Sequence, residues 1–186
     1  VETSFTDIAK DEWDNLSGAA KGRPGSVYNP FVSHAYLSAL EESGSATAET
    51  GWLGQHLLIE DQAGRIAGGL ISYLKNHSQG EYVFDHGWAD AFARAGGHYY
   101  PKLQSSVPFT PATGPRLLVR PGEDRQATQA TLAAGLMELT RRHDASSAHI
   151  TFLPEDELPV LETAGFLHRT DQQFHFENAG YSTHEQ

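Results

Sequence analysis

The stretch QHLLIEDQAGRIAGGLISYL, residues 55–74, predicts two β-strands joined by a tight turn. Residues 55–60 and 65–74 are apolar runs of strand length, and the tetrapeptide between them, Asp-Gln-Ala-Gly, favours a turn. An antiparallel hairpin is the simplest arrangement for two strands separated by so few residues. We therefore expect a sheet that contains at least this antiparallel pair.

Two helices and a short strand are expected before the hairpin. Residues 1–6 favour a strand, and residues 10–16 favour a short helix with Trp13 and Leu16 on one face. Ser33 is placed to cap a second helix that runs to residue 42 and ends at Gly44.

The segment after the hairpin alternates between strands and helices. Residues 123–143 give the clearest helix, with Leu132, Leu136 and Leu139 at i, i+4 and i+7 and basic residues in the last turn. A shorter helix is expected over 155–164, ended by Gly165. The remaining strands are expected at residues 116–119, 148–152, 166–169 and 172–177. The whole pattern predicts an α/β fold with a mixed, mostly antiparallel sheet of six or seven strands flanked by helices.

Length and composition limit the class of protein. The 186 residues fit one domain, which we place at 1–178, with 179–186 as the start of a linker or helix. A net charge of −11 opposes binding to nucleic acid by this chain alone, and no apolar run is long enough to span a membrane. The absence of cysteine fits a reducing compartment, so we expect a cytoplasmic protein.

Functional side chains concentrate between residues 75 and 114, which we expect to form one long loop. Its sequence FDHGWADAFARAGGHYYPKLQSSVPFTPATGP, residues 84–115, is unusually dense in aromatic and ionisable residues. We predict that His86 or Asp85 acts as a base towards an incoming amine. The predicted substrate-binding residues are Lys75, His77, Trp88, Tyr99, Tyr100, Lys102 and Gln104.

A purely structural interpretation of the same loop is also open. Trp88 and Phe92, at i and i+4 of a short helix over 87–95, have the spacing of packing residues. Asp85 then caps that helix, or pairs with Lys102 in a structural ion pair. The ten histidines are dispersed without a metal-ligand spacing, so we predict no metal site, and no GxSxG motif indicates a serine hydrolase.

The order of elements, with the step LETAGF at 161–166, resembles the GNAT acyl-CoA N-acyltransferase fold. Four stretches more specifically resemble bacterial FemAB-like proteins of the peptidoglycan-biosynthesis type: NPFVSHAYLSALEESGSA (29–46), YLKNHSQGEYVFDHGWADA (73–91), GGHYYPKLQSSVPFTPATGPRLL (96–118) and QQFHFENAGY (172–181). Such proteins resemble two GNAT-like halves in tandem. The resemblance therefore implies that this chain is an N-terminal half whose partner is a missing C-terminal half, and it leaves an oligomer open.

The resemblance also implies transfer of an acyl or aminoacyl group to the amine of a small molecule or cell-wall precursor. GNAT enzymes hold the CoA pyrophosphate at a helix N-terminus with a Q/R-x-x-G-x-G/A loop. Here the corresponding residues 119–127, VRPGEDRQA, contain a proline, a single glycine and two carboxylates. We therefore expect no cofactor on this half, although the full-length protein would use acyl-CoA or an aminoacyl donor. The alternative function is a non-catalytic ligand-binding or dimerisation module.

Overall fold

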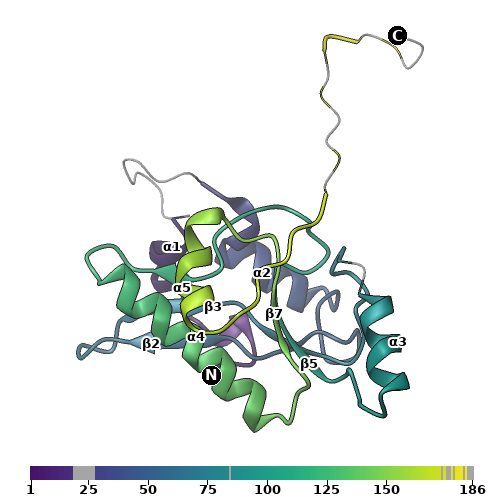
Figure 1. Cartoon of the computed structure of the whole chain (residues 1–186). Helices are drawn as coiled ribbons and strands as arrows, with labels where there is room; N and C mark the ends of the chain where they lie inside the picture. Colours follow the sequence, from purple (N-terminus) through teal and green to yellow (C-terminus); the bar gives the residue numbers. More distant parts are fainter. Residues whose placement is uncertain are drawn as a thin grey trace.

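Seven β-strands form two sheets in the computed structural model, which describes residues 1–18, 28–83, 85–172, 174, 177, 179–181 and 183 (Figure 1). Four of the five strand pairs are antiparallel and one is parallel. The predicted α/β class with a mixed, mostly antiparallel arrangement is therefore confirmed, although the strands divide between two sheets.

The predicted hairpin forms the three-stranded sheet. Strands β2 (Leu57–Glu60) and β3 (Ile66–Leu70) pair antiparallel, and β6 (Leu118–Val119) joins the free side of β3. Asp61 stabilises the turn, because its carboxylate accepts hydrogen bonds from the backbone N–H groups of Ala63 and Arg65. Gly64 follows at a φ of 76°, a value that favours glycine.

The run at 65–74 is two strands rather than the single strand predicted. Strand β4 (Tyr73–Lys75) pairs with β1 (Leu53–Gly54) in a second sheet. The ladder is interrupted at His56, whose backbone N–H and C=O both bond to Glu2, at 2.7 and 2.9 Å. The N-terminal segment thus takes backbone groups that a continuous hairpin would have used. The N-terminal segment forms this isolated bridge and a short 3-10 helix, η1 (Phe5–Asp7), in place of the strand expected at 1–6.

The second sheet has four strands in the order β1-β4-β5-β7. Strand β5 (Lys102–Ser105) is antiparallel to β4, and β7 (Ala148–Ile150) is parallel to β5. The expected long loop thus contains a strand that the sequence analysis missed, together with the helix α3 (His86–Arg94), which lies at the edge of the molecule beyond β5 (Figure 1).

Helices α1 (Lys10–Ser17) and α4 (Arg125–Arg142) both pack on the three-stranded sheet, and α4 also packs on one face of the four-stranded sheet. The predicted long helix is α4, followed by η3 (Glu155–Glu157) and α5 (Leu158–Thr163). Leu132, Leu136 and Leu139 of α4 are buried against Leu70 and Leu103 of the strands.

The second part of the core lies with the N-terminal helices α1 (Lys10–Ser17) and α2 (His34–Glu42), which η2 (Pro30–Val32) precedes. Ser33 caps α2 as predicted, accepting a hydrogen bond from the N–H of Tyr36. Trp13 is fully buried and meets Phe5 edge to face, with ring centroids 4.9 Å apart.

The strands predicted after Gly165 are absent from the described part of the chain. Residues 166–169 are not in a strand, and neither are the described residues of 172–177, of which 173, 175 and 176 lie outside the description. The alternation of apolar residues predicted a buried face there, but Leu167 is 95% exposed and Phe174 is 86% exposed. No helix among the described residues is long and apolar enough to cross a membrane.

Candidate functional site

The four-stranded sheet has one apolar face and one polar face. Because successive side chains of a strand alternate, Leu74 and Leu103 point towards α4, and their neighbours point the other way. The register pairs Lys75 with Lys102 on β4 and β5, and Gln104 with His149 on β5 and β7. These four side chains lie on the polar face together with Tyr73, which pairs with Gln104. Glu81 and Asp85 from the segment 76–101 contact this face.

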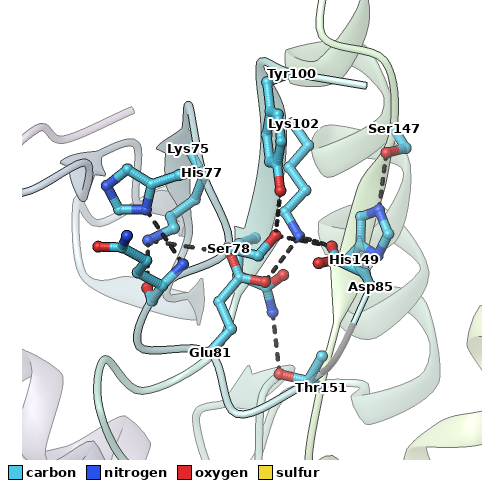
Figure 2. Close-up of polar contacts among 12 residues, drawn as sticks. Lys75, His77, Ser78, Glu81, Asp85, Tyr100, Lys102, Ser147, His149 and Thr151 are labelled. Atoms are coloured by element: carbon cyan, nitrogen blue, oxygen red, sulfur yellow. Dashed lines mark hydrogen bonds and ion pairs between the residues drawn. The ribbon is translucent and has the colours of Figure 1, made fainter. Parts of the chain in front are cut away.

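Lys102 is the centre of a buried charge cluster on this face (Figure 2). Its Nζ lies 2.7 Å from Oε2 of Glu81 and 2.6 Å from Oδ2 of Asp85. All three residues are at most 3% exposed. Burial raises the pKa of Glu81, although the positive charge of Lys102 opposes that rise. Two lysines and two carboxylates make the cluster electrically neutral, which is the condition under which charges are tolerated inside a protein.

Lys75 is the second lysine of the cluster and is fully buried. Its Nζ lies 3.3 Å from the centroid of the Trp52 ring, donates to the backbone oxygen of Gln79 at 3.2 Å, and is 4.0 Å from Oε1 of Glu81. Burial lowers the pKa of Lys75 to about 8, despite the opposing charge of Glu81. Part of the Lys75 population is therefore neutral at slightly alkaline pH.

Asp85 collects hydrogen bonds from several donors. Besides Lys102, its Oδ2 accepts from the hydroxyls of Ser78 at 2.8 Å and Tyr99 at 2.9 Å. Ser78 in turn lies 2.7 Å from the hydroxyl of Tyr100, which must donate because the Ser78 proton is directed at Asp85. Burial acts to raise the pKa of Asp85, but these donors and the charge of Lys102 lower it overall. Asp85 is thus a stable carboxylate and a poor proton acceptor.

Three buried oxygen atoms at the cluster have no hydrogen-bond partner among the described residues. They are Oε1 of Glu81, Oδ1 of Asp85 and Oε1 of Gln104. The amide nitrogen of Gln104 donates to the Thr151 hydroxyl at 3.0 Å. Because all three atoms are acceptors, a group that donates N–H or O–H hydrogen bonds suits them.

His149 of β7 lies at the side of the cluster. Its ring centroid is 6.0 Å from that of Tyr99, and its Nε2 lies 2.8 Å from the Ser147 hydroxyl. Burial, with the positive charge of Lys102, lowers the pKa of His149 to about 4. At neutral pH the ring is therefore uncharged and a weak proton acceptor.

The structure brings six of the nine predicted site residues to the cluster: Lys75, Asp85, Tyr99, Tyr100, Lys102 and Gln104. The other three form no hydrogen bond or ion pair with these six among the described residues, although His77 lies beside Lys75 (Figure 2). His86 is exposed at the start of α3, Trp88 is 58% exposed with Cζ of Arg169 at 5.7 Å from its ring centroid, and Nδ1 of His77 accepts from the N–H of Gln79. Of the two structural roles considered for Asp85, the ion pair is present, whereas no side-chain bond caps α3.

Sequence reasoning missed Ser78, Glu81 and His149. Ser78 and Glu81 lie in irregular backbone, where no periodicity indicates which side chains point inward. His149 is far along the chain, and only the parallel pairing of β5 with β7 places it beside Gln104. One signal was available: the alternation of Lys102, Leu103 and Gln104 is that of a two-faced strand.

The N-terminus of α4 is occupied by the protein's own groups. Oδ1 of Asp124 accepts from the N–H of Ala127 at 3.0 Å, which is an ordinary helix cap. Arg120 donates to the backbone oxygen of Ile66 at 2.6 Å and to the carboxylate of Glu12. The N–H of Ala127 and the guanidinium of Arg120 are thus both bonded within the chain.

The α/β fold with mixed sheets is consistent with a GNAT-like fold, and one solved structure is similar to it. An acetyltransferase from Trypanosoma brucei is 14% identical in sequence, with a TM-score of 0.50 over 91% of this chain and 95% of its own. The chain belongs to the FemAB-like family, described as peptidoglycan biosynthesis/recognition, whose sequence model matches residues 4–186. No curated protein matches the sequence significantly.

Proposed function

We propose that this chain is the N-terminal GNAT-like half of a cytoplasmic acyl or aminoacyl transferase that acts on an amine acceptor of peptidoglycan biosynthesis. Membership of the FemAB-like family supports the class of reaction. The polar face beneath residues 76–101 supplies the acceptor site. The single observation that carries this assignment is the group of three unpartnered buried acceptor oxygens beside Lys102.

Each part of the cluster has a role in this proposal. The acceptor amine donates its N–H groups to Glu81 and Gln104, each of which has a buried oxygen without a hydrogen-bond partner among the described residues. An amine must lose a proton to attack an acyl carbon, but a pKa of about 4 makes His149 too weak a base for this step, as the lowered pKa does for Asp85. Asp85 holds Lys102 in place rather than acting as the base. Access requires residues 76–101 to move, since Lys75 and Lys102 are at most 1% exposed.

The acyl donor, in this proposal, does not bind here in the usual GNAT manner. The carboxylate of Asp124 at the first turn of α4 would compete with a pyrophosphate for the same N–H group and would repel it. The donor, acyl-CoA or an aminoacyl ester, would be presented by a second half of the protein.

The acceptor role is tested by calorimetric titration of a soluble peptidoglycan stem peptide that carries a free side-chain amine. We expect saturable heat from this peptide and none from the same peptide acetylated on that amine. Gln104→Ala should weaken binding by about two- to tenfold, the equivalent of one hydrogen bond. His86→Ala, an exposed residue of α3, is the matched control and should bind like the wild type. Equal heat from both peptides would contradict the proposal.

The donor assignment has its own test. Acetyl-CoA titrated at millimolar concentration should give no saturable heat with this chain. Saturable binding that disappears when Gly122 is replaced would mean that the start of α4 is a nucleotide site after all.

A second function, a dimerisation module, is favoured by the surface of α3. No residue of α3 is buried, and Trp88 and Phe92 are 58% and 43% exposed. Tyr99 and Tyr100 face the cluster, whereas Trp88 faces solvent, so the aromatic residues of this segment divide between the two functions. Sedimentation equilibrium of the wild type and of Trp88→Ala distinguishes them: a dimer lost on substitution supports the module.

A further inference from the structure

A second concave site lies outside the cluster, at the β1 edge of the four-stranded sheet. It is a depression of about 280 Å³ between the N-terminal segment, α2 and β1, and its walls include Thr3, Ser4, Glu41, Thr47, Ala48 and Gly54. The volume is near the lower limit of small-molecule sites, roughly 300–1,000 Å³. None of its lining residues belongs to the Lys102 cluster.

Glu41 is the only ionisable residue among the described residues that line this depression. Its Oε2 accepts hydrogen bonds from the Ser4 hydroxyl at 2.6 Å and the N–H of Phe5 at 2.7 Å. Its Oε1 has a single long contact, 3.3 Å to Nε2 of His56. The carboxylate is therefore held rigidly, and Oε1 keeps capacity for a further donor.

The negative charge of Glu41 is not compensated. The N–H of Ser72 donates to Nδ1 of His56, so the ring proton is on Nε2 and is directed at Glu41. Burial lowers the pKa of the fully buried His56, which is thus neutral at neutral pH. Burial acts to raise the pKa of Glu41, but the hydrogen bonds from His56, Ser4 and Phe5 lower it overall. No lysine or arginine in the described part of the chain forms an ion pair with Glu41.

Two residues behind the wall describe its surroundings. Tyr73, directly across the strand pair from Gly54, is fully buried and does not line the depression, and its hydroxyl has no hydrogen-bond partner among the described residues. Burial and then the charge of Glu41 raise the pKa of Tyr73, so the phenol lies within the field of this carboxylate. A side chain at Gly54 would come within 2.3 Å of the backbone oxygen of Thr3 and 3.1 Å of Nε2 of His56, which shows how closely the wall approaches the His56–Glu41 pair.

We propose that this depression binds an organic ammonium ion, with the N–H groups of the ligand donating to Oε1 of Glu41. A rigid carboxylate that lacks a protein cation binds a cation that supplies both positive charge and hydrogen-bond donors. The carbon chain of the ligand lies against Ala46, Ala48 and Leu53, which form the apolar part of the wall. This site is independent of the acceptor site proposed above.

The test uses n-butylammonium chloride as the probe, followed by amide chemical shifts in NMR. Saturable shifts in the millimolar range are expected at Ser4, Thr47, Ala48 and Gly54, and sodium chloride at the same concentration should not reproduce them. Glu41→Gln should abolish the saturation. Glu42→Gln is the matched control, because it removes the same charge from an exposed residue one position away. Shifts that persist in Glu41→Gln, or that sodium chloride reproduces, would overturn the proposal.

A second variant keeps the proposal falsifiable if Glu41→Gln disturbs the fold. Ala48 is exposed at the wall, and Ala48→Lys places a tethered ammonium group beside Glu41 without altering the hydrogen bonds of that carboxylate. The folded Ala48→Lys protein should no longer bind n-butylammonium. Unchanged binding by this variant would refute the site.

Discussion

On one face of the four-stranded sheet Leu74 and Leu103 pack under α4, whereas on the other face their neighbours Lys75 and Lys102 are buried with Glu81 and Asp85. Burying a leucine side chain contributes about 1.5–3 kcal/mol and needs no particular partner. A buried ion pair contributes little net stability, but it is costly to break. The apolar face is thus explained by core packing, whereas the polar face is the part of the sheet that needs a functional explanation.

Breaking the polar face should give the largest effect. Lys102→Ala leaves Glu81 and Asp85 buried without their cation, so we expect a loss of about 3–5 kcal/mol in the free energy of unfolding. Urea denaturation measures this loss. Hydrogen exchange should show loss of protection mainly in α3, because no side chain of that helix is buried.

A balanced substitution is the control for this result. Lys102→Met combined with Asp85→Leu removes one charge of each sign and should cost less than Lys102→Ala alone. If Lys102→Ala alone lowers the free energy of unfolding by less than about 1 kcal/mol, water reaches the cluster freely, contrary to its burial.

Breaking the apolar face should cost somewhat less, and in a different way. Leu103→Ala, adjacent in the same strand, removes a fully buried side chain and should lower the free energy of unfolding by about 2–5 kcal/mol. Because this side chain belongs to the main core, exchange protection should fall throughout α4 and β5. The control is Leu167→Ala, which is 95% exposed and should change stability by less than about 0.5 kcal/mol. A loss confined to α3 would contradict the division between the faces.

The sequence predicted the apolar side of this comparison better than the polar side. The leucine period of α4, the Asp61–Gly64 turn and the Ser33 cap are local signals, and each is confirmed. β5 was missed because its lysine and glutamine resemble loop residues. Lys102 is tolerated in the interior because Glu81 and Asp85 compensate its charge. Such compensation depends on contacts distant in sequence, which no pattern of period 2 or 3.6 encodes.

Of the two faces, only the polar face should make stability depend on pH, because Lys75 titrates there. The expected change in the free energy of unfolding is smaller than those above. Burial gives Lys75 a folded pKa of about 8, below its value of 10.5 in the unfolded chain. Between these two values the unfolded chain binds a proton that the folded protein does not, so stability should rise as the pH increases from about 8 to 10.5. Urea denaturation across this range measures the slope.

Two variants test whether Lys75 causes the rise of stability with pH. Lys75→Met should reduce it, whereas Lys10→Met, a lysine whose side chain is 58% exposed on α1, should leave the rise attributable to Lys75 in place. An NMR titration of the Lys75 side chain should have its midpoint near pH 8. A midpoint at the ordinary lysine value would mean that the cluster is hydrated.

The smallest effect is expected outside both faces, on α3. Trp88→Ala removes a side chain that is 58% exposed, so the free energy of unfolding of the monomer should change by less than about 0.5 kcal/mol. Thermal unfolding at low protein concentration measures it. A larger loss at high concentration only would indicate that Trp88 stabilises an oligomer, since association stabilises the folded state by mass action.

Phe92→Ala is the informative companion of this variant. Phe92 is on the same helix and also exposed, but its ring centroid lies 5.8 Å from that of Tyr99, which donates to Asp85. If α3 only covers the polar face, Phe92→Ala should be the more destabilising of the two and should do so equally at all protein concentrations. If α3 forms an interface, both variants should show the same concentration dependence, and the aromatic residues on this helix would be explained by association rather than by the cluster.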